Sequence, residues 1–479
     1  MKRRGIGAAL GVLAMLSGCG GGSNENGGGT IVDVPAATPT PTPTPASCSL
    51  RSRQDWAAGQ LQEWYLFGET LPAFLDPSPY ASVDSYIDAL TATARAQGRD
   101  RYFTYLTSIA EENAYYQSGS SAGFGFRLIY DTQARRVFVA ETFEGTPALS
   151  AGVDRGAEIV AVGTSTADLR AVSDIMATSG AQGVVDALGP STTGTARVLR
   201  VADGAGTRTV TLTKTDYSLT PVSTRYGARI LDDGGRKVGY VNLRTFINTA
   251  DPALREAFLG FRNAGVTEII VDLRYNGGGL VAIGELLGDL MGANRFASDI
   301  FSYTTFRPQK SSENEVRNFM AQPQSVAPTR VAFIGTGGTA SASELVINAF
   351  IPYLRANAAL IGTNTYGKPV GQIAIDRTAC DDRLRIVAFA VENAARNASY
   401  FNGLAGSMDA TCRAPDDLTR PLGDPQEASI RQALDFLAGR SCTPIATGQA
   451  ARALTAAAER ELLSPLRPDV TQRETPGAF

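Results

Sequence analysis

After residue 220 the chain alternates short apolar runs with helical stretches, and this alternation limits the possible folds more than any other feature. The apolar runs cover 237–243, 268–273 and 329–334, with helical patterns around 253–263 and after Gly279. Strands that alternate with helices form largely parallel sheets, whose functional sites lie at the carboxyl ends of the strands. The sequence therefore predicts an α/β domain, placed at 218–442, with a site at that edge.

The run 329–334 leads into a glycine-rich turn, 335–340, and then into a helix that begins near Ser341 and Ser343. A glycine turn before a helix start presents backbone N–H groups and the positive end of the helix dipole, which suits an oxyanion. Serine also caps helices at such positions, and Glu344 in the first turn fits a cap. On spacing alone, capping is the better supported of the two interpretations.

The sequence contains no histidine, which excludes a Ser-His-Asp triad. A serine nucleophile would need another base, and the neutral amine of a lysine is the usual substitute. Lys368, in Tyr366-Gly367-Lys368, is the candidate. A lysine with a pKa of about 10.4 is only about 0.04% neutral at pH 7, so this role requires burial that lowers the pKa.

The first part of the folded chain has two patterns. Apolar residues at helical spacing predict a small helical N-terminal domain over 48–118. Strand-like runs follow, punctuated in order by Gly123-Phe124-Gly125-Phe126, Gly145-Thr146-Pro147-Ala148, Ala151-Gly152-Val153 and Gly156 with Ile159. This order resembles a PDZ domain of the bacterial protease type, which we place at 119–217. The resemblance implies that Gly123, Phe124, Gly125 and Phe126 bind the carboxylate of a peptide that adds as a strand.

Three blocks together resemble the C-terminal processing peptidases, which are tail-specific proteases of the Ser-Lys type, over about residues 50 to 440. The blocks are Asp272-Leu273-Arg274-Tyr275-Asn276-Gly277-Gly278-Gly279, Thr339-Ala340-Ser341-Ala342-Ser343-Glu344 and Tyr366-Gly367-Lys368-Pro369-Val370-Gly371-Gln372. The resemblance implies that Ser341 is the nucleophile, that Lys368 is the base and that Gln372 holds Lys368. It also implies an oxyanion hole formed by the backbone N–H groups of Gly278 and Ala342.

The fold implied is a multidomain α+β protein whose protease core is crotonase- and ClpP-like, without cofactor or metal. The expected function is a serine endopeptidase that cleaves exported proteins or peptides near their free C-termini through an acyl-enzyme. The alternative is a catalytically inactive lipoprotein that uses its PDZ domain for peptide binding or scaffolding. We interpret Asp272 and Arg274 as a structural ion pair. The net charge of −3 predicts no nucleic-acid partner.

The first 19 residues have the pattern of an export signal: a basic start, an apolar stretch over 5–15, and Leu16-Ser17-Gly18-Cys19. That tetrad resembles a bacterial lipobox, which implies lipidation of Cys19 and a periplasm-facing, membrane-anchored protein in the bacterial cell envelope. Gly20 after the cysteine favours the outer membrane. An ordinary secretory signal is the alternative. Residues 20–47 are rich in Gly, Thr and Pro and predict an extended tether.

Four further cysteines, Cys48, Cys380, Cys412 and Cys442, predict two disulfides in an exported protein. Of the three possible pairings we expect Cys380 with Cys412 and Cys48 with Cys442. Metal binding is the alternative, but no two of them have Cys-x-x-Cys spacing. The remaining segment, 443–479, has a helical pattern over 450–463. We expect a loosely ordered tail, with docking to an adaptor or a homo-oligomer partner as the alternative.

Overall fold

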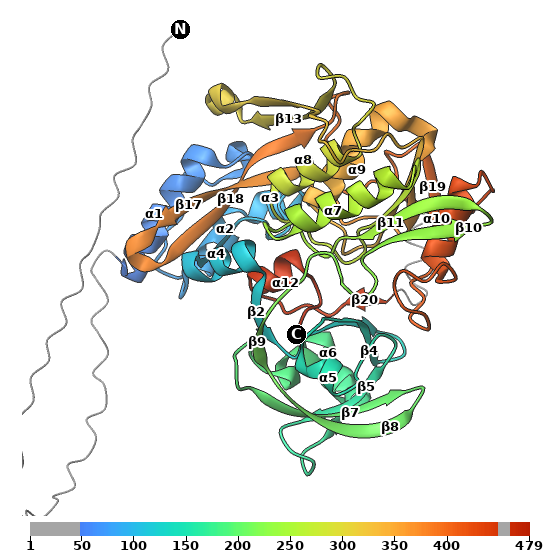
Figure 1. Cartoon of the computed structure of the whole chain (residues 1–479). Coiled ribbons are helices and arrows are strands. Elements are labelled where there is room, and N and C mark those ends of the chain that lie inside the picture. The colour runs from blue at the N-terminus through green and yellow to red at the C-terminus, as the bar shows by residue number, and fades with distance from the viewer. Residues whose placement is uncertain (1–47, 449–459) are drawn as a thin grey trace, which may run out of the picture. The chain divides into compact units, whose positions relative to one another are not determined.

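The computed structural model describes residues 48–448 and 460–479, which belong to one compact unit, Pro45–Phe479 (Figure 1). The predicted signal, Cys19 and the tether lie outside the described residues. The central sheet has the order β10-β11-β12-β15-β16-β19. Its strands are β10 (Ala228–Asp233), β11 (Arg236–Asn242), β12 (Glu268–Asp272), β15 (Arg330–Gly335), β16 (Ala358–Gly362) and β19 (Ala410–Arg413).

All neighbours in this sheet are parallel except β10 and β11. Helices cover both faces, with α7 (Ala250–Asn263), α8 (Val281–Leu290) and α9 (Ala342–Leu354) on one and α10 (Ala428–Leu437) on the other. Ile269 and Val271 join the first core and Ile270 joins the second, because successive strand side chains point to opposite faces. The predicted alternation of strands and helices is confirmed.

A second sheet, β1-β18-β13-β14 with β17 beside β18, contains the long hairpin of β17 (Val370–Arg377) and β18 (Asp382–Glu392). Its other strands are β1 (Tyr105–Ser108), β13 (Ile300–Phe306) and β14 (Glu315–Asn318). Short stretches of 3-10 helix lie at Gly68–Thr70, Pro308–Glu313, Arg355–Asn357 and Thr378–Cys380.

The segment predicted as a helical N-terminal domain spans 48–118. It contains α1 (Leu50–Trp64), α2 (Val83–Leu90), α3 (Ala92–Ala96) and α4 (Ile109–Ser118), but also β1, which pairs with β18. Leu61 and Ile87 of its helices share a core with Leu384 and Ile386 of β18. These helices therefore pack on the second sheet and share an apolar core with it.

Residues 120–218 are here called the β-rich segment. The segment begins with β2 (Ser120–Gly123) and ends with β9 (Thr215–Ser218), and these two strands pair with each other. Between them lie β3 (Phe126–Asp131), β4 (Arg136–Thr142), α5 (Pro147–Ser150), β5 (Glu158–Gly163), β6 (Arg170–Ala171), α6 (Val172–Leu188), β7 (Ala196–Asp203) and β8 (Gly206–Thr213). The main sheet has the order β20-β3-β4-β5-β7-β8, in which β20 is Glu461–Leu462, and it packs around its own apolar core.

The expected disulfide pairing is wrong, although all four cysteines are bonded. Cys48 pairs with Cys380, and Cys412 pairs with Cys442. Cys48 lies next to α1, which packs on the second sheet, so its neighbour is Cys380 at the β17–β18 turn. Cys412 on β19 lies in the core that α10 covers, beside Cys442.

The expectation of a loosely ordered end is also wrong for 460–479. Glu461–Leu462 is strand β20, which pairs with β3, and Val470–Glu474 is helix α12. Thr475 is fully buried and Phe479 is 3% exposed. Most of the predicted helix over 450–463 lies outside the described residues, and its described end is strand.

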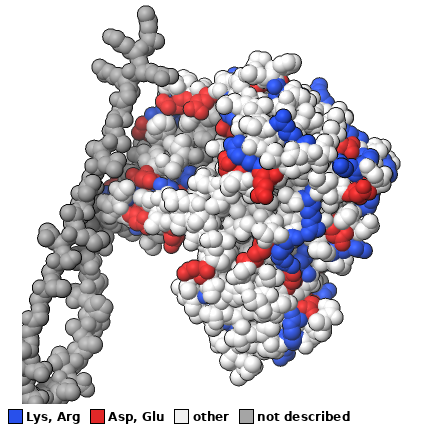
Figure 2. All heavy atoms as spheres, viewed as in Figure 1, with Lys and Arg blue, Asp and Glu red and all other residues white. Residues whose placement is uncertain are grey.

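Acidic and basic side chains are interspersed on the face that Figure 2 shows. Charged side chains of the described residues form ion pairs, such as Arg136 with Glu158 and Arg431 with Asp435. The small net charge thus reflects paired charges of both signs. Across the described residues, no helix is long and apolar enough to span a bilayer.

Candidate active site

Ser341 lies where the sequence predicted, at the start of α9 beyond the carboxyl end of β15. Its φ of 56° is a left-handed value, which is uncommon for a residue with a side chain and is often found at functional sites. Its backbone N–H donates to Glu344 Oε2 (3.2 Å). Ser343 is buried and its hydroxyl donates to the Asn276 carbonyl (3.1 Å), so the structure gives Ser343 a packing role.

Lys368 lies in the loop between β16 and β17. Its Nζ donates to Gln372 Oε1 (2.8 Å), and Gln372 Nε2 donates in turn to the Phe103 carbonyl. The ammonium also lies 5.0 Å from the centre of the Phe103 ring. The structure therefore brings Lys368 and Gln372 together as the sequence predicted. Ser341 and Lys368, both within the described range, do not hydrogen-bond each other.

Glu344 connects the two candidates, although the sequence pattern indicated only a helix cap. Its carboxylate is fully buried and accepts the backbone N–H groups of Ser341 (3.2 Å), Gly367 (2.7 Å) and Lys368 (2.7 Å). Burial raises the pKa of Glu344, and these hydrogen bonds oppose the rise. One buried carboxyl thus fixes the main chain of both loops. The Ser-x-x-Glu spacing was the only local signal for it.

Burial lowers the pKa of Lys368 below its ordinary value of 10.5. Among neighbouring charges, Glu474 and Asp100 raise that pKa, whereas Arg473 and Arg385 lower it. Desolvation acts in this direction because it penalises the charged ammonium. The lysine is therefore more readily neutral than a lysine in water.

The backbone N–H groups of Gly278 and Ala342, the two predicted oxyanion donors, flank Ser341. They differ in whether the N–H already donates a hydrogen bond within the protein. A Cβ built on Gly278, whose φ is 121°, would lie 2.7 Å from Ser341 Cβ, so only glycine fits there. The Gly278 N–H donates to Asn276 Oδ1 (2.9 Å) within its own loop. Ala342 is the first residue of α9, where a backbone N–H has no acceptor within the helix.

Asp272 and Arg274 form the predicted structural ion pair (2.9 Å), and both side chains are fully buried. Arg274 also pairs with Glu427 (2.9 Å) and Asp416 (3.2 Å). Nothing in the local pattern indicated these two partners, which come from the segment after β19. The cluster fixes the start of the glycine run.

The predicted peptide-binding loop, Gly123–Phe126, already holds part of this chain. The N–H groups of Gly125 and Phe126 point to the backbone oxygen of Phe479 (2.9 and 3.4 Å). A Cβ built on Gly123 would lie 2.7 Å from the carbonyl carbon of Phe479. Phe124 and Phe126 turn their rings into the core of the β-rich segment.

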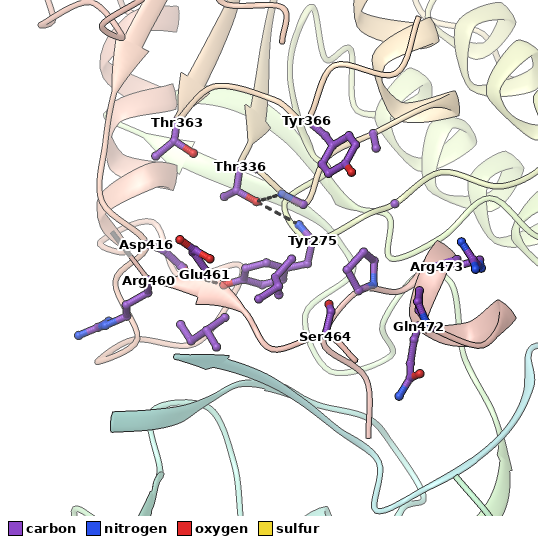
Figure 3. A pocket seen from close by; sticks show the side chains of 18 of the residues that line it. Tyr275, Thr336, Thr363, Tyr366, Asp416, Arg460, Glu461, Ser464, Gln472 and Arg473 are labelled. Carbon is purple, nitrogen blue, oxygen red and sulfur yellow. Dashed lines mark hydrogen bonds between the residues drawn. The ribbon is translucent and has the colours of Figure 1, made fainter. Parts of the chain in front are cut away.

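A cavity of about 2080 Å³ lies beside these loops. Lys368, Tyr366, Gly338 and Ala340 line it, together with residues of β20 and α12. Figure 3 shows Tyr275, Thr336 and Tyr366 around this space, with Gln472 and Arg473 of α12 at its edge. The cavity is large enough for several residues of an extended peptide.

Residues 237–394 match Peptidase family S41. The chain is 31% identical over 280 residues to the C-terminal processing peptidase, chloroplastic, of Tetradesmus obliquus, with 54% of each chain covered. It is 27% identical over 256 residues to the carboxyl-terminal-processing protease of a Synechocystis species, covering 52% of this chain and 54% of that protein. The chain thus spans about half the length of these curated relatives.

The solved structures add evidence on the fold. The putative S41 protease from Bacteroides fragilis has a TM-score of 0.61 at 21% identity, with 80% of this chain and 97% of that chain covered. This similarity extends to most of the described residues and concerns the fold alone. The sequence matches show that residues 237–394 carry a peptidase S41 domain and that homologues of this chain are named C-terminal processing peptidases.

Proposed function

We propose that the chain is a serine endopeptidase in which Ser341 is the nucleophile and Lys368 is the general base. The observation that carries this proposal is the Glu344 carboxylate, which binds the backbone N–H groups of both residues. A shared buried anchor keeps the two loops in register, as a catalytic pair requires. The lowered pKa of Lys368 supports the same assignment.

In the proposed reaction, neutral Lys368 removes the hydroxyl proton of Ser341 as the Oγ attacks the scissile carbonyl. The N–H groups of Ala342 and Gly278 stabilise the oxyanion, and the lysinium then protonates the leaving amine. Water hydrolyses the resulting acyl-enzyme. This sequence requires Lys368 Nζ to turn from Gln372 toward Ser341, and the Gly278 N–H to leave Asn276 Oδ1.

The substrates we propose are exported proteins or peptides, cut near their C-termini. In this proposal residues 119–217 are a PDZ domain, and the Gly123–Phe126 loop receives the substrate C-terminus while the peptide pairs with β3. The N–H groups of Gly125 and Phe126 support this role because they point to the backbone oxygen of Phe479, next to the antiparallel bridge between Arg127 and Ala478. The core, 218–442, supplies the catalytic residues.

The proposed location is the bacterial cell envelope, with Cys19 lipidated and the chain facing the periplasm from the outer membrane. The two disulfides support export, because such bonds persist in oxidising compartments. Replacing Cys19 by Ala is expected to release the protein from the membrane fraction. Unchanged membrane retention of Cys19→Ala would contradict lipid anchoring.

The decisive test compares Ser341→Ala with Ser343→Ala in the full chain, using an unfolded protein as substrate and mass spectrometry to identify fragments. The two serines are two residues apart, so Ser343→Ala is a matched control. We expect Ser341→Ala to lose cleavage and Ser343→Ala to retain it. Cleavage that survives Ser341→Ala would overturn the assignment, and a chain that binds peptides without cleaving them would be the inactive binding lipoprotein.

A further inference from the structure

Residues 460–479, here called the terminal segment, pair at two places with the edge of β3 that faces away from β4. Leu462 pairs with Ile129, and the Leu463 N–H donates to the Leu128 carbonyl (2.9 Å). After α12 the chain returns, and the Leu128 N–H donates to the Gly477 carbonyl (2.8 Å). The terminal segment therefore occupies the edge to which a substrate strand would add.

The last three residues fit this edge closely. Phe479 donates its N–H to the Phe126 carbonyl (3.0 Å), and Ala478 lies opposite Arg127 in antiparallel pairing. The Phe479 ring joins the core that contains Phe124 of the loop and Ile175 of α6. Figure 1 accordingly places this end of the chain beside α5 and α6. Phe479, which follows the two small residues Gly477 and Ala478, thus fills the apolar space between the Gly123–Phe126 loop and α6.

The same segment covers the glycine run beside Ser341. The Glu474 carbonyl accepts the Gly277 N–H (3.0 Å), and a Cβ on Gly277 would lie 2.4 Å from the Arg473 carbonyl oxygen. Arg473 also donates to the Tyr102 carbonyl (3.2 Å) and lies 3.6 Å from the centre of the Tyr105 ring. The backbone of α12 therefore contacts the loop that holds Gly278.

Buried polar contacts hold the segment in place. The Thr475 hydroxyl hydrogen-bonds the Tyr115 hydroxyl (2.8 Å), and the Tyr116 hydroxyl donates to Glu474 Oε1 (2.9 Å). Arg127 Nη1 donates to the carbonyls of Pro476 (2.7 Å) and Tyr275 (2.7 Å). A single nitrogen of Arg127 thus donates hydrogen bonds both to the terminal segment and to the loop before the glycine run.

The charges of the segment act on Lys368. Glu474 raises the pKa of Lys368 and is the strongest of the charged neighbours, ahead of Arg473 and Arg385, which lower it, and Asp100, which raises it. A group that raises this pKa favours the ammonium, which cannot accept the proton of Ser341. Within the docked segment, Glu474 therefore opposes the neutral form of Lys368, whereas Arg473 favours it.

We propose that residues 469–479 are an intramolecular inhibitor that competes with substrate for the β3 groove. Residues 477–479 show the residue pattern that this groove accepts: two small residues followed by a large aromatic one. A ligand must displace the segment, whose effective concentration is on the order of millimolar because it is tethered. The inference deepens the proposed function, on which it rests, by adding regulation of the same site.

The test measures peptide binding in the full chain carrying Ser341→Ala, so that no cleavage intervenes. The probe is a fluorescent peptide with the sequence of residues 470–479, and its anisotropy reports binding. We expect Phe479→Asp in the protein to tighten binding at least about tenfold, because it expels the inhibitor. Leu466→Asp is the matched control, since Leu466 is 84% exposed and its replacement leaves the groove occupied. A probe whose last residue is Asp should bind at least about tenfold more weakly.

A second measurement does not depend on any variant of the segment. Hydrogen–deuterium exchange of the Ser341→Ala protein is followed with and without saturating probe. Exchange in 469–479 should rise on binding while β3 stays protected. Equal affinity of the parent and Phe479→Asp proteins, or a segment that stays protected when the probe is bound, would overturn the inference.

Failure of the inference and failure of the proposed peptidase give different results. With Ser341 intact, Phe479→Asp should cleave an unfolded protein faster than the parent. If neither protein cleaves but the probe still displaces the segment, the groove inference stands and the peptidase does not. If both cleave equally in a Ser341-dependent way, the peptidase stands and intramolecular inhibition is wrong.

Discussion

At the level of single residues, the protonation of Lys368 controls the proposed reaction. A general base must be neutral, and burial lowers the pKa of this amine below 10.5, against the opposing effects of Glu474 and Asp100. Deprotonation accompanies rising pH, so kcat/KM should increase with pH and level off with a midpoint below 10.5. A profile of kcat/KM between about pH 6 and pH 10 tests this. A profile that falls over that range would contradict the base assignment.

A change at Gln372 makes this prediction specific. Gln372→Glu places a carboxylate 2.8 Å from Lys368 Nζ, where it stabilises the ammonium, so the midpoint should move to higher pH. Every tenfold drop in the acid dissociation constant of Lys368 lowers its neutral fraction about tenfold at neutral pH. Gln372→Met, which removes the hydrogen bond without adding charge, is the control and should not raise the midpoint. Superimposable profiles for Gln372→Glu and wild type would rule out Lys368 as the titrating group.

At the level of elements, the buried ion cluster after β12 determines where the glycine run begins. Arg274→Met would leave Asp272 and Glu427 buried without their cation. It should therefore lower the free energy of unfolding by about 3 to 5 kcal/mol. Arg396 pairs with Glu392 on the surface and is 58% exposed, so Arg396→Met should change stability by less than about 1 kcal/mol. Urea unfolding of both variants checks the difference. Similar losses in the two would show that the cluster does not stabilise the fold.

The elements also show what the sequence could predict. The strand 268–273 was evident because Ile269, Ile270 and Val271 form an apolar run that parallel sheets bury on both faces. The helix start at Ser341 followed from its glycine turn. Local patterns could not reveal that Tyr105 pairs with Arg385, because pairing across such a separation depends on tertiary packing.

The site was predictable to a similar extent. The contact of Lys368 with Gln372 followed from a family resemblance, whereas no spacing rule indicated that Glu344 would also bind the Lys368 backbone. The docked position of Phe479 was missed for the same reason. A polar, proline-containing end resembles a loose tail until a binding edge for it is known.

At the scale of the whole molecule, disulfides and hydrogen bonds connect residues that are far apart in the sequence. Cys48 at the start of α1 is bonded to Cys380 across a separation of 332 residues, whereas Cys412 and Cys442 are separated by 30. Arg127 of the β-rich segment likewise contacts both the terminal segment, at the Pro476 carbonyl, and the loop before the glycine run, at the Tyr275 carbonyl. Of these connections, the disulfides act mainly on the unfolded chain, which loses more freedom when a longer loop is closed.

The two disulfides should therefore differ in their contribution to stability. In the chain-entropy model the stabilisation grows with the logarithm of loop length, so the Cys48–Cys380 bond should exceed the Cys412–Cys442 bond by about 2 kcal/mol. The comparison is between Cys48→Ser/Cys380→Ser and Cys412→Ser/Cys442→Ser, each unfolded in urea under non-reducing conditions. Peptide mapping of the unreduced protein is the control for the pairing. A larger loss from removal of the shorter loop would mean that native packing around Cys412, and not loop closure, sets the order.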